Sequence, residues 1–209
     1  MRTVLIDYGA GNLHSVERAL QRAGLAVERA SHPASAAGAE AMVLPGQGHF
    51  GQVMRAFKAS GFESPVRAHL AAGRPFLGIC VGLQLLLEAS EEAPEVPGLG
   101  LLRGTARRFP ATGVSVPHMG WNQIEPRGRP ALLEGVADGA FVYFAHSYYV
   151  AFEELDVPGA VTEYGPVRFK SAISQGPLHA TQFHPEKSQA VGLRVLENFA
   201  RLAANALEA

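Results

Sequence analysis

Residues 76–86 constrain the fold of this chain more than any other stretch. An apolar run ends at Gly78, the only cysteine follows at position 80, and Gly82 precedes an apolar pattern of helical spacing. The spacing Gly-x-Cys-x-Gly predicts a strand, a tight turn and a helix, with Cys80 at the turn, as in the Gly-x-Ser-x-Gly nucleophile elbow. Glycine suits both flanking positions because such a turn is sharp, strained and short of space for side chains.

Two interpretations of Cys80 remain open at this point. A thiol at the N-terminus of a helix lies near unpaired backbone N–H groups, which favour the thiolate, so Cys80 would be a nucleophile. A lone cysteine is also commonly a small buried hydrophobic side chain without chemistry. The two glycines and the strand–helix context raise the weight of the first interpretation without removing the second.

Composition limits the classes of protein to consider. The 209 residues, 47% of them hydrophobic, suffice for one sizeable core, so we expect a single domain over residues 1–209. The net charge of −1, with charges interspersed, indicates neither a nucleic-acid surface nor a basic membrane patch. One cysteine permits no internal disulfide, which fits a reducing cytoplasm. No apolar run approaches the roughly 20 residues of a membrane span.

The first half of the chain alternates predicted strands and helices. Short apolar runs predict strands at residues 4–7, 25–30, 41–44 and 76–79. Apolar residues at helical spacing predict helices at residues 13–23, 50–57, 64–72 and 83–89. This alternation predicts an α/β fold with a parallel sheet and helices on both faces.

The second half has a different pattern, with an acidic loop at residues 91–100 followed by mostly short strands. These strands are predicted at residues 105–109, 114–116, 121–124, 141–149, 161–163, 167–170, 172–174 and 179–183. A final helix is predicted at residues 189–207. Turn signals at Gly165-Pro166 and Gly176-Pro177 separate neighbouring strands, so we expect antiparallel additions to the main sheet.

Polar segments follow several predicted strands at the edge where binding crevices form in parallel sheets. Gly46 and Gly48 leave backbone N–H groups accessible, which suits an oxyanion hole, although a plain strand-to-helix turn reads the same way. His184 follows a predicted strand and is a candidate general base. Glu186, two residues on and beyond a proline, can hold the ring in one tautomer. His146 ends the aromatic strand, where core packing is the simpler interpretation.

Cys80, His184 and Glu186 together make a nucleophile, a base and an orienting carboxylate for thiol acyl transfer. No Cys/His cluster has zinc spacing, and neither a Walker A loop nor a Gly-x-Gly-x-x-Gly fingerprint is present. We therefore expect neither a metal nor a cofactor.

These residues resemble the class I glutamine amidotransferases, which share the elbow Gly-Ile-Cys-Val-Gly-Leu-Gln at residues 78–84 and the triplet His184-Pro185-Glu186. Within that family the chain is similar to the glutaminase subunits of imidazole glycerol phosphate synthase, of histidine biosynthesis. The segments that carry this resemblance are residues 7–12, 45–50, 117–122, 143–149 and 183–188. The Pro-His-Met-Gly-Trp-Asn segment at 117–122 is the most specific. Gln47 departs from the family, which usually has a small aliphatic residue there.

The resemblance implies a three-layer α/β/α fold with a mostly parallel, flavodoxin-like central sheet and antiparallel strands in the second half. It implies that the Cys80 thiolate attacks the side-chain amide of glutamine, that His184 protonates the leaving ammonia, and that Glu186 orients His184. Water then hydrolyses the γ-glutamyl thioester. Backbone N–H groups at Gly48 and Val81 would hold the oxyanion. The residues expected to bind the amino-acid end of glutamine are Gln84, Glu92, Ser147 and Tyr148.

The resemblance also implies a partner, a (β/α)8-barrel cyclase that forms a heterodimer with this chain and receives the ammonia. The expected contact and gate residues are Asn12, Trp121, Asn122, Tyr143 and Lys187. Without the resemblance, we would interpret Trp121 and Tyr143 as side chains that fill the core, and Lys187 as a charged side chain in solvent. With it, they fit the aromatic enrichment of protein interfaces.

Three alternatives remain beside this hypothesis. A glutaminase subunit of pyridoxal phosphate synthase would have the same triad but accounts poorly for residues 117–122. A γ-glutamyl hydrolase or related cysteine hydrolase acting on peptides would need no ammonia channel. A non-catalytic binding subunit could keep the fold, although the intact Cys80, His184 and Glu186 set argues against it.

Overall fold

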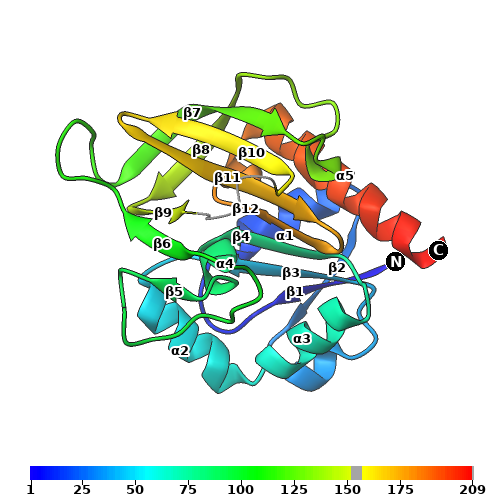
Figure 1. The fold of residues 1–209 in the computed structure, drawn as a ribbon. Helices are drawn as coiled ribbons and strands as arrows, with labels where there is room; N and C mark the ends of the chain where they lie inside the picture. The colour runs from blue at the N-terminus through cyan, green and yellow to red at the C-terminus, as the bar shows by residue number, and fades with distance from the viewer. Residues whose placement is uncertain (152–156, 209) are drawn as a thin grey trace.

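The computed structural model describes residues 1–151 and 157–208 (Figure 1). Its main sheet has the strand order β2-β1-β3-β4-β12-β11-β10-β7-β8. The first five strands in that order run parallel to one another. They are β2 (Ala26–Ala30), β1 (Arg2–Ile6), β3 (Ala41–Gly46), β4 (Phe76–Cys80) and β12 (Leu178–Thr181). We call these strands the parallel half, and they confirm the predicted α/β alternation.

Helices cover both faces of the parallel half (Figure 1). The chain moves one way along the sheet from β1 through α1 to β2, and the opposite way from β3 through α2 and α3 to β4. Because such crossovers are right-handed, the two connections lie on opposite faces. The helices are α1 (Leu13–Arg22), α2 (Phe50–Ser60), α3 (Glu63–Ala71), α4 (Val81–Leu85) and α5 (Gln189–Glu208).

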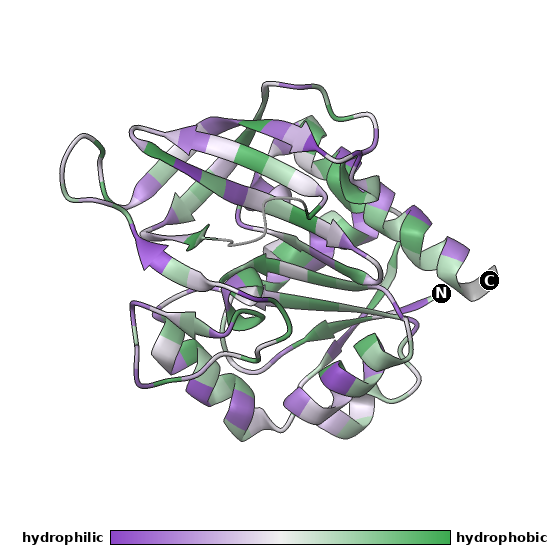
Figure 2. Cartoon of the chain, viewed as in Figure 1, coloured by the Kyte–Doolittle hydropathy of each residue, from purple (hydrophilic) through white to green (hydrophobic). Residues whose placement is uncertain are grey.

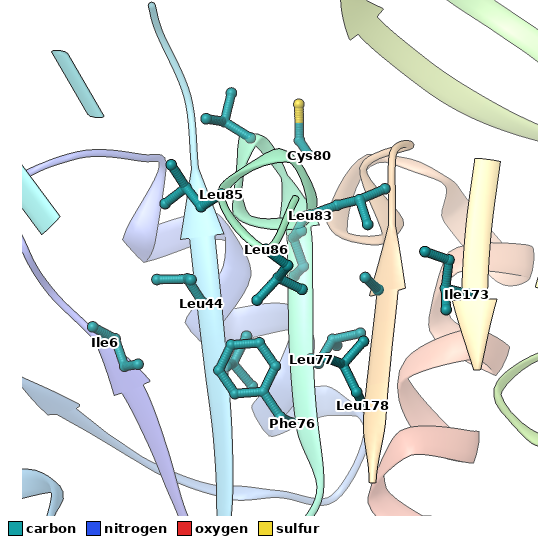
Figure 3. Packing of buried hydrophobic residues seen from close by; sticks show 14 of the residues in the cluster. Ile6, Leu44, Phe76, Leu77, Cys80, Leu83, Leu85, Leu86, Ile173 and Leu178 are labelled. Carbon is teal, nitrogen blue, oxygen red and sulfur yellow. The ribbon is translucent and has the colours of Figure 1, made fainter. Parts of the chain in front are cut away.

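The core of the parallel half is largely aliphatic. Every residue of β3 and of β4 is buried. Strands covered on both faces read as continuous apolar runs, which is why these two were evident from sequence. Figure 2 shows the same central strands in hydrophobic colour. In Figure 3 Phe76, Leu77 and Leu44 pack around β4, while the Cys80 sulfur at its carboxyl end is directed away from them.

The remaining four strands of the main sheet are joined antiparallel and form the antiparallel half. They are β11 (Val167–Gln175), β10 (Gly159–Tyr164), β7 (His118–Arg127) and β8 (Ala140–His146). A second sheet of three strands has the order β5-β6-β9, with β5 (Ala89–Ser90), β6 (Thr105–Arg108) and β9 (Tyr148–Ala151). Short 3-10 turns lie at η1 (Pro33–Ala36), η2 (Ala131–Leu133) and η3 (Pro185–Lys187).

The antiparallel half has an aromatic core. Phe109 lies at its centre, with ring centroids 5.2 Å from His146, 5.3 Å from Tyr164 and 5.6 Å from Phe169. His118 stacks between Phe144, at 4.7 Å, and Tyr164, at 3.9 Å. Two imidazoles are therefore packed among phenyl rings, away from solvent. Within the described ranges, no helix combines the length and apolar character needed to cross a membrane.

Four element predictions were wrong in detail. The helix after the elbow ends at Leu85 instead of residue 89, because the chain tightens to three-residue hydrogen bonds and then forms β5. Residues 114–116 are irregular and bent instead of forming a strand. The strand predicted at 141–149 divides at Ser147, where the chain leaves the main sheet for the second sheet. Strands predicted at 167–170 and 172–174 are one strand, β11.

Candidate active site

The candidate site lies where the two halves of the main sheet meet. β4 pairs in parallel with β12, with Ile79 opposite Thr181, so the two strands end side by side. Cys80 ends β4, and His184 follows β12 by three residues. The registered ends of adjacent parallel strands thus bring together two residues that are more than one hundred positions apart in the sequence.

The backbone at Cys80 is strained, with φ 55° and ψ −111°, values that residues with a side chain rarely adopt. The flanking glycines make this turn feasible. A Cβ atom on Gly82 would lie 2.0 Å from the Leu44 carbonyl oxygen, and one on Gly78 would lie 3.0 Å from the Gly82 carbonyl oxygen. Any larger residue at position 82 would therefore push β3 and α4 apart.

His184 is held by Glu186. The His184 Nδ1 atom lies 2.8 Å from Glu186 Oε1, and the two side chains are only 3% and 1% exposed. A carboxylate accepts hydrogen bonds, so Nδ1 carries the proton in this contact and Nε2 is left for Cys80. Burial by itself lowers the pKa of His184, but the charge of Cys80, its hydrogen bond and the Glu186 carboxylate outweigh burial and raise that pKa.

Two glutamines connect to the sulfur in sequence, Gln182 directly and Gln84 through Gln182, and the sequence predicts only Gln84 for the site. Gln182 Nε2 donates to Cys80 Sγ over 3.7 Å, and Gln182 Oε1 accepts from Gln84 Nε2 at 3.1 Å. Gln84 Nε2 also donates to the Tyr148 carbonyl at 3.2 Å. Gln182 precedes the strand-end histidine by two residues. The available signal was an amide two residues before that histidine, within the strand predicted at residues 179–183.

A cavity of about 330 Å³ opens over Cys80. It has the size of a small-molecule site. The structure gathers around it most residues that sequence analysis assigned to catalysis, oxyanion stabilisation and glutamine binding: Gly48, Cys80, Val81, Gln84, Glu92, Ser147, Tyr148 and His184. Residues not predicted for the site also line it: Gln47, Pro117, Met119, Ala145 and His146. Glu186 lies behind His184 and does not line the cavity.

The turn at residues 45–49 forms one wall. Gly48 has φ 107°, which suits glycine, and a Cβ atom on Gly46 would lie 2.7 Å from the Gly82 nitrogen. Tyr8 Oη donates to the Pro45 carbonyl at 2.6 Å and ties the turn to the N-terminal loop. Burial, together with the charge of Cys80, raises the pKa of Tyr8, so its phenol keeps the proton that makes this bond.

Glu92 reaches the same wall from the loop between β5 and β6. Its Oε2 atom accepts a hydrogen bond of 2.6 Å from the backbone N–H of Phe50, the first residue of α2. The Glu92 N–H donates to Ser90 Oγ at 3.2 Å. These two bonds fix a carboxylate at the cavity, next to the turn that contains Gly48.

The residues predicted for a partner surface do not all share one face. Strand pairing sets Trp121 opposite Tyr143 and Met119 opposite Ala145. The rings of Trp121 and Tyr143 meet edge to face at 6.0 Å, and Lys187 Nζ lies 5.8 Å from the centre of the Tyr143 ring. Asn122 follows Trp121 directly, so its side chain turns to the opposite face of β7, as strand alternation requires.

The remaining two assignments have clear local roles. Asn122 Nδ2 donates to the Glu163 carbonyl at 2.9 Å and lies 3.3 Å from His118 Nε2, at the edge of the aromatic core. Asn12 caps α1, where its Oδ1 atom accepts from the Ser15 N–H at 3.3 Å. The outward face of β7 and β8 is instead apolar and exposed, with Met119 at 64%, Trp121 at 46% and Phe141 at 53% exposure.

Comparison with known proteins gives a consistent result. The family described as "Glutamine amidotransferase class-I" matches residues 4–202. The chain is 56% identical to the imidazole glycerol phosphate synthase subunit HisH of Deinococcus radiodurans, over 95% of this chain and 92% of that protein. It is 50% identical to the subunit of the same name from Thermus thermophilus, over 94% of this chain and 95% of that protein. A solved glutamine amidotransferase superposes with a TM-score of 0.75 at 22% identity, covering 96% of this chain and 98% of that one.

Proposed function

The chain belongs to the class-I glutamine amidotransferase family, and we propose that it uses Cys80, His184 and Glu186 to hydrolyse glutamine for an imidazole glycerol phosphate synthase of histidine biosynthesis. The observation that carries the proposal is that Cys80 and His184 are hydrogen-bonded beneath one cavity, while Glu186 Oε1 lies 2.8 Å from His184 Nδ1 on the far side of the ring. A nucleophile, a base and an orienting carboxylate in that order are what thiol acyl transfer requires.

The first chemical step forms a bond from the Cys80 sulfur to the carbonyl carbon of the glutamine side chain. His184, which its surroundings keep protonated, gives its Nε2 proton to the amide nitrogen as the carbon–nitrogen bond breaks and ammonia leaves. The neutral His184 then takes a proton from water, which attacks the γ-glutamyl thioester. Glutamate leaves, and the thiolate and imidazolium are restored. Glu186 keeps the His184 ring in the same tautomer throughout.

The tetrahedral intermediate needs donors for its oxyanion. Gly48 and Val81 line the cavity together with Cys80, and we assign this role to their backbone N–H groups. The Glu92 carboxylate attracts the α-ammonium group of glutamine. Gln84 uses Nε2 within the protein, so its Oε1 atom is the one available to the substrate, with Ser147 and Tyr148 alongside.

The product ammonia is destined for a second subunit, which we propose to be a (β/α)8-barrel cyclase in a heterodimer. Met119 supports this path because it lines the cavity and also belongs to the exposed apolar face with Trp121 and Phe141. An apolar surface beside the cavity mouth suits a protein partner that closes over it. Tyr143 and Lys187 lie at the rim of this surface. A reducing compartment such as the cytoplasm suits a nucleophile that must remain a free thiol.

The test is reconstitution with a candidate cyclase and its nucleotide substrate. Cys80→Ala is expected to abolish synthesis from glutamine and to leave synthesis from added ammonia intact, because only the glutaminase step uses the thiol. Ammonia-supported synthesis is thus the internal control. Loss of both activities would mean that Cys80 is structural, and retention of both would mean that it is not the nucleophile.

The partner claim has its own test. We expect weak glutaminase turnover by the isolated chain and strong turnover in the complex, and we expect Trp121→Ala or Lys187→Ala to weaken assembly or coupling more than fold stability. Arg55→Ala, an exposed change on α2, is the matched control. Full turnover by the isolated chain, or unchanged affinity in both variants, contradicts the claim.

A further inference from the structure

The proposed mechanism gives no role to two adjacent buried imidazoles of the antiparallel half, His118 and His146. His118 is 3% exposed and His146 is 6% exposed, and both pack among the rings of the antiparallel half. Burying an imidazole needs hydrogen-bond partners that an apolar ring of the same size would not need. His146 also lines the cavity above Cys80. These two side chains therefore call for an explanation beyond packing.

The hydrogen bonds of the pair assign a tautomer to each ring. His146 Nδ1 lies 2.7 Å from the Tyr148 carbonyl, which can only accept, so Nδ1 carries the proton. In the neutral ring His146 Nε2 is then an acceptor, and it faces His118 Nδ1 at 3.1 Å, so His118 Nδ1 carries a proton too. His118 Nε2 is left as an acceptor, 3.3 Å from Asn122 Nδ2.

Main-chain groups fix the other end of this chain of bonds independently. Asn122 Nδ2 donates to the Glu163 carbonyl at 2.9 Å, and Asn122 Oδ1 accepts from the Gln123 N–H at 2.8 Å. The amide of Asn122 is thus oriented by the backbone, and it presents N–H to His118. The backbone groups at the two ends of this series of hydrogen bonds therefore impose the same donor-to-acceptor direction on every hydrogen bond between them. An added proton on His118 Nε2 or on His146 Nε2 would meet another N–H.

The Tyr148 carbonyl connects this series of hydrogen bonds to the Cys80 sulfur. It accepts from His146 Nδ1 and also from Gln84 Nε2, at 3.2 Å. Because Gln84 presents N–H groups, Gln182 turns its Oε1 atom toward Gln84 and its Nε2 atom toward Cys80. The main chain leaves β8 and enters β9 between His146 and Tyr148, where Tyr148 lies opposite Arg108 of β6. The Tyr148 carbonyl accepts from the side chains of His146 and Gln84, so His146 helps to hold it.

We propose that His118 and His146, both neutral and both protonated at Nδ1, are positioning residues that hold the Tyr148 carbonyl and so direct the amides of Gln84 and Gln182 toward substrate and the Cys80 sulfur. This inference rests on the proposed glutaminase function. Aromatic walls support the neutral form, since burial lowers the pKa of His118 and of His146. Asn122 is part of this hydrogen-bonded set, on the inner face of β7, while Trp121 lies on the outer face.

The first test measures the tautomers in the full chain with ¹H–¹⁵N correlation spectra of the imidazole nitrogens. Both rings are expected to be neutral at pH 7, with protons on Nδ1. A proton on Nε2 of either ring, or an imidazolium at pH 7, overturns the proposal. This measurement does not depend on glutaminase activity, so it also decides the case where a variant fails to fold.

The second test compares variants in the complex with the cyclase. His118→Phe keeps a ring between Phe144 and Tyr164 but removes the donor to His146, and His118→Asn restores a donor near the Nδ1 position. Loss of one buried hydrogen bond predicts a fall of about ten-fold in kcat/KM for glutamine, mainly through KM, with partial recovery in His118→Asn. Phe169→Leu is the packing control, because Phe169 touches both imidazoles without bonding to them.

The rate at which iodoacetamide alkylates Cys80 provides a readout independent of glutamine. We expect His118→Phe to slow alkylation and Phe169→Leu to leave it unchanged. Equal effects of these two variants on KM and on alkylation would mean that the pair only fills the core, and would overturn the proposal. If the wild-type complex hydrolyses no glutamine, the proposed function fails, whereas the tautomers and the alkylation rates still test the pair.

Discussion

The two halves of the main sheet are packed with different types of side chain. The parallel half packs aliphatic side chains against strands buried on both faces, and it carries the nucleophile on the strained turn after β4. The antiparallel half packs phenyl and imidazole rings, and its strands expose an apolar outer face. Cys80 comes from the first half, whereas Met119, Ala145 and His146 line the same cavity from the second.

This difference suggests that the two halves contribute to the site in different ways. Close backbone approach in the parallel half needs glycines and leaves little tolerance for a change in volume, since a Cβ atom on Gly82 would clash with β3. The antiparallel half instead contains polar groups whose hydrogen bonds have a direction, which ordered rings can hold in place. Steric fit therefore determines the position of the nucleophile, and the direction of the hydrogen bonds determines the orientation of the polar groups around it. A substitution in one half, or a change in pH, therefore tests one of these two contributions.

The largest effect is expected from Gly82→Ala, which disturbs the parallel half alone. Its Cβ atom would lie 2.0 Å from the Leu44 carbonyl oxygen, so backbone must move and we expect a loss of more than about 4 kcal/mol in the free energy of unfolding. Urea unfolding measures it. Gly73→Asn is the control, because that glycine has φ 70° with open space around it and should lose no more than about 1 kcal/mol. Equal losses in the two variants would contradict the steric account.

Phe109→Ala disturbs the antiparallel half by removing a ring that packs against it. Its ring touches His118, His146, Tyr149 and two further rings, so its removal opens a cavity and should cost about 3–4 kcal/mol. Phe141→Ala, a change of the same size at a ring that is 53% exposed, should cost less than about 1 kcal/mol. A small loss for Phe109→Ala would mean that the aromatic core is not what stabilises this half.

Glu186→Gln tests the junction between the halves. The carboxylate helps to raise the pKa of His184, so its removal lowers that pKa and should shift the alkaline limb of the glutaminase pH profile toward neutral pH. We also expect kcat to fall on the order of 100-fold, because the imidazole loses its orienting partner. Glu17→Gln, which breaks a surface ion pair with Arg29, is the matched control and should change neither quantity. An unshifted alkaline limb in Glu186→Gln would remove Glu186 from the mechanism.

The smallest effect concerns stability against pH in the antiparallel half. Burial lowers the pKa of His118 to about 4 and of His146 to about 3, whereas the unfolded chain binds protons near 6.5. Stability is thus fully present above pH 6.5 and is lost as pH falls toward 4, by ~2 kcal/mol for each histidine between pH 7 and 5. Urea midpoints across this range measure the slope. His118→Phe should reduce it, and an unchanged slope would contradict the assignment.

The sequence predicts the parallel half better than the antiparallel half, for a physical reason. Gly78, Cys80 and Gly82 encode their turn locally, and strands buried on both faces appear as apolar runs. The second sheet depends on pairing between residues 105–108 and 148–151, which no local pattern specifies. This is also why the strand predicted at 141–149 was continuous and the helix after the elbow was too long.

The candidate site follows the same rule. Cys80, His184 and Glu186 were recognisable because each follows a predicted strand, and their meeting follows from parallel pairing. Gln182 and the His118–His146 pair became evident only from their hydrogen-bond partners. The separation of Asn122 from Trp121 is predictable from the sequence, since adjacent residues of a strand face opposite sides of the sheet.

The most direct measurement of the central claim is covalent labelling of the full chain, in complex with the cyclase, by a glutamine analogue that carries an electrophile on its side chain. Peptide mass mapping should find one adduct, on Cys80, whose formation is prevented by excess glutamine and slowed in His184→Ala. A folded complex in which Cys80 stays unmodified, or in which glutamine gives no protection, would contradict the account.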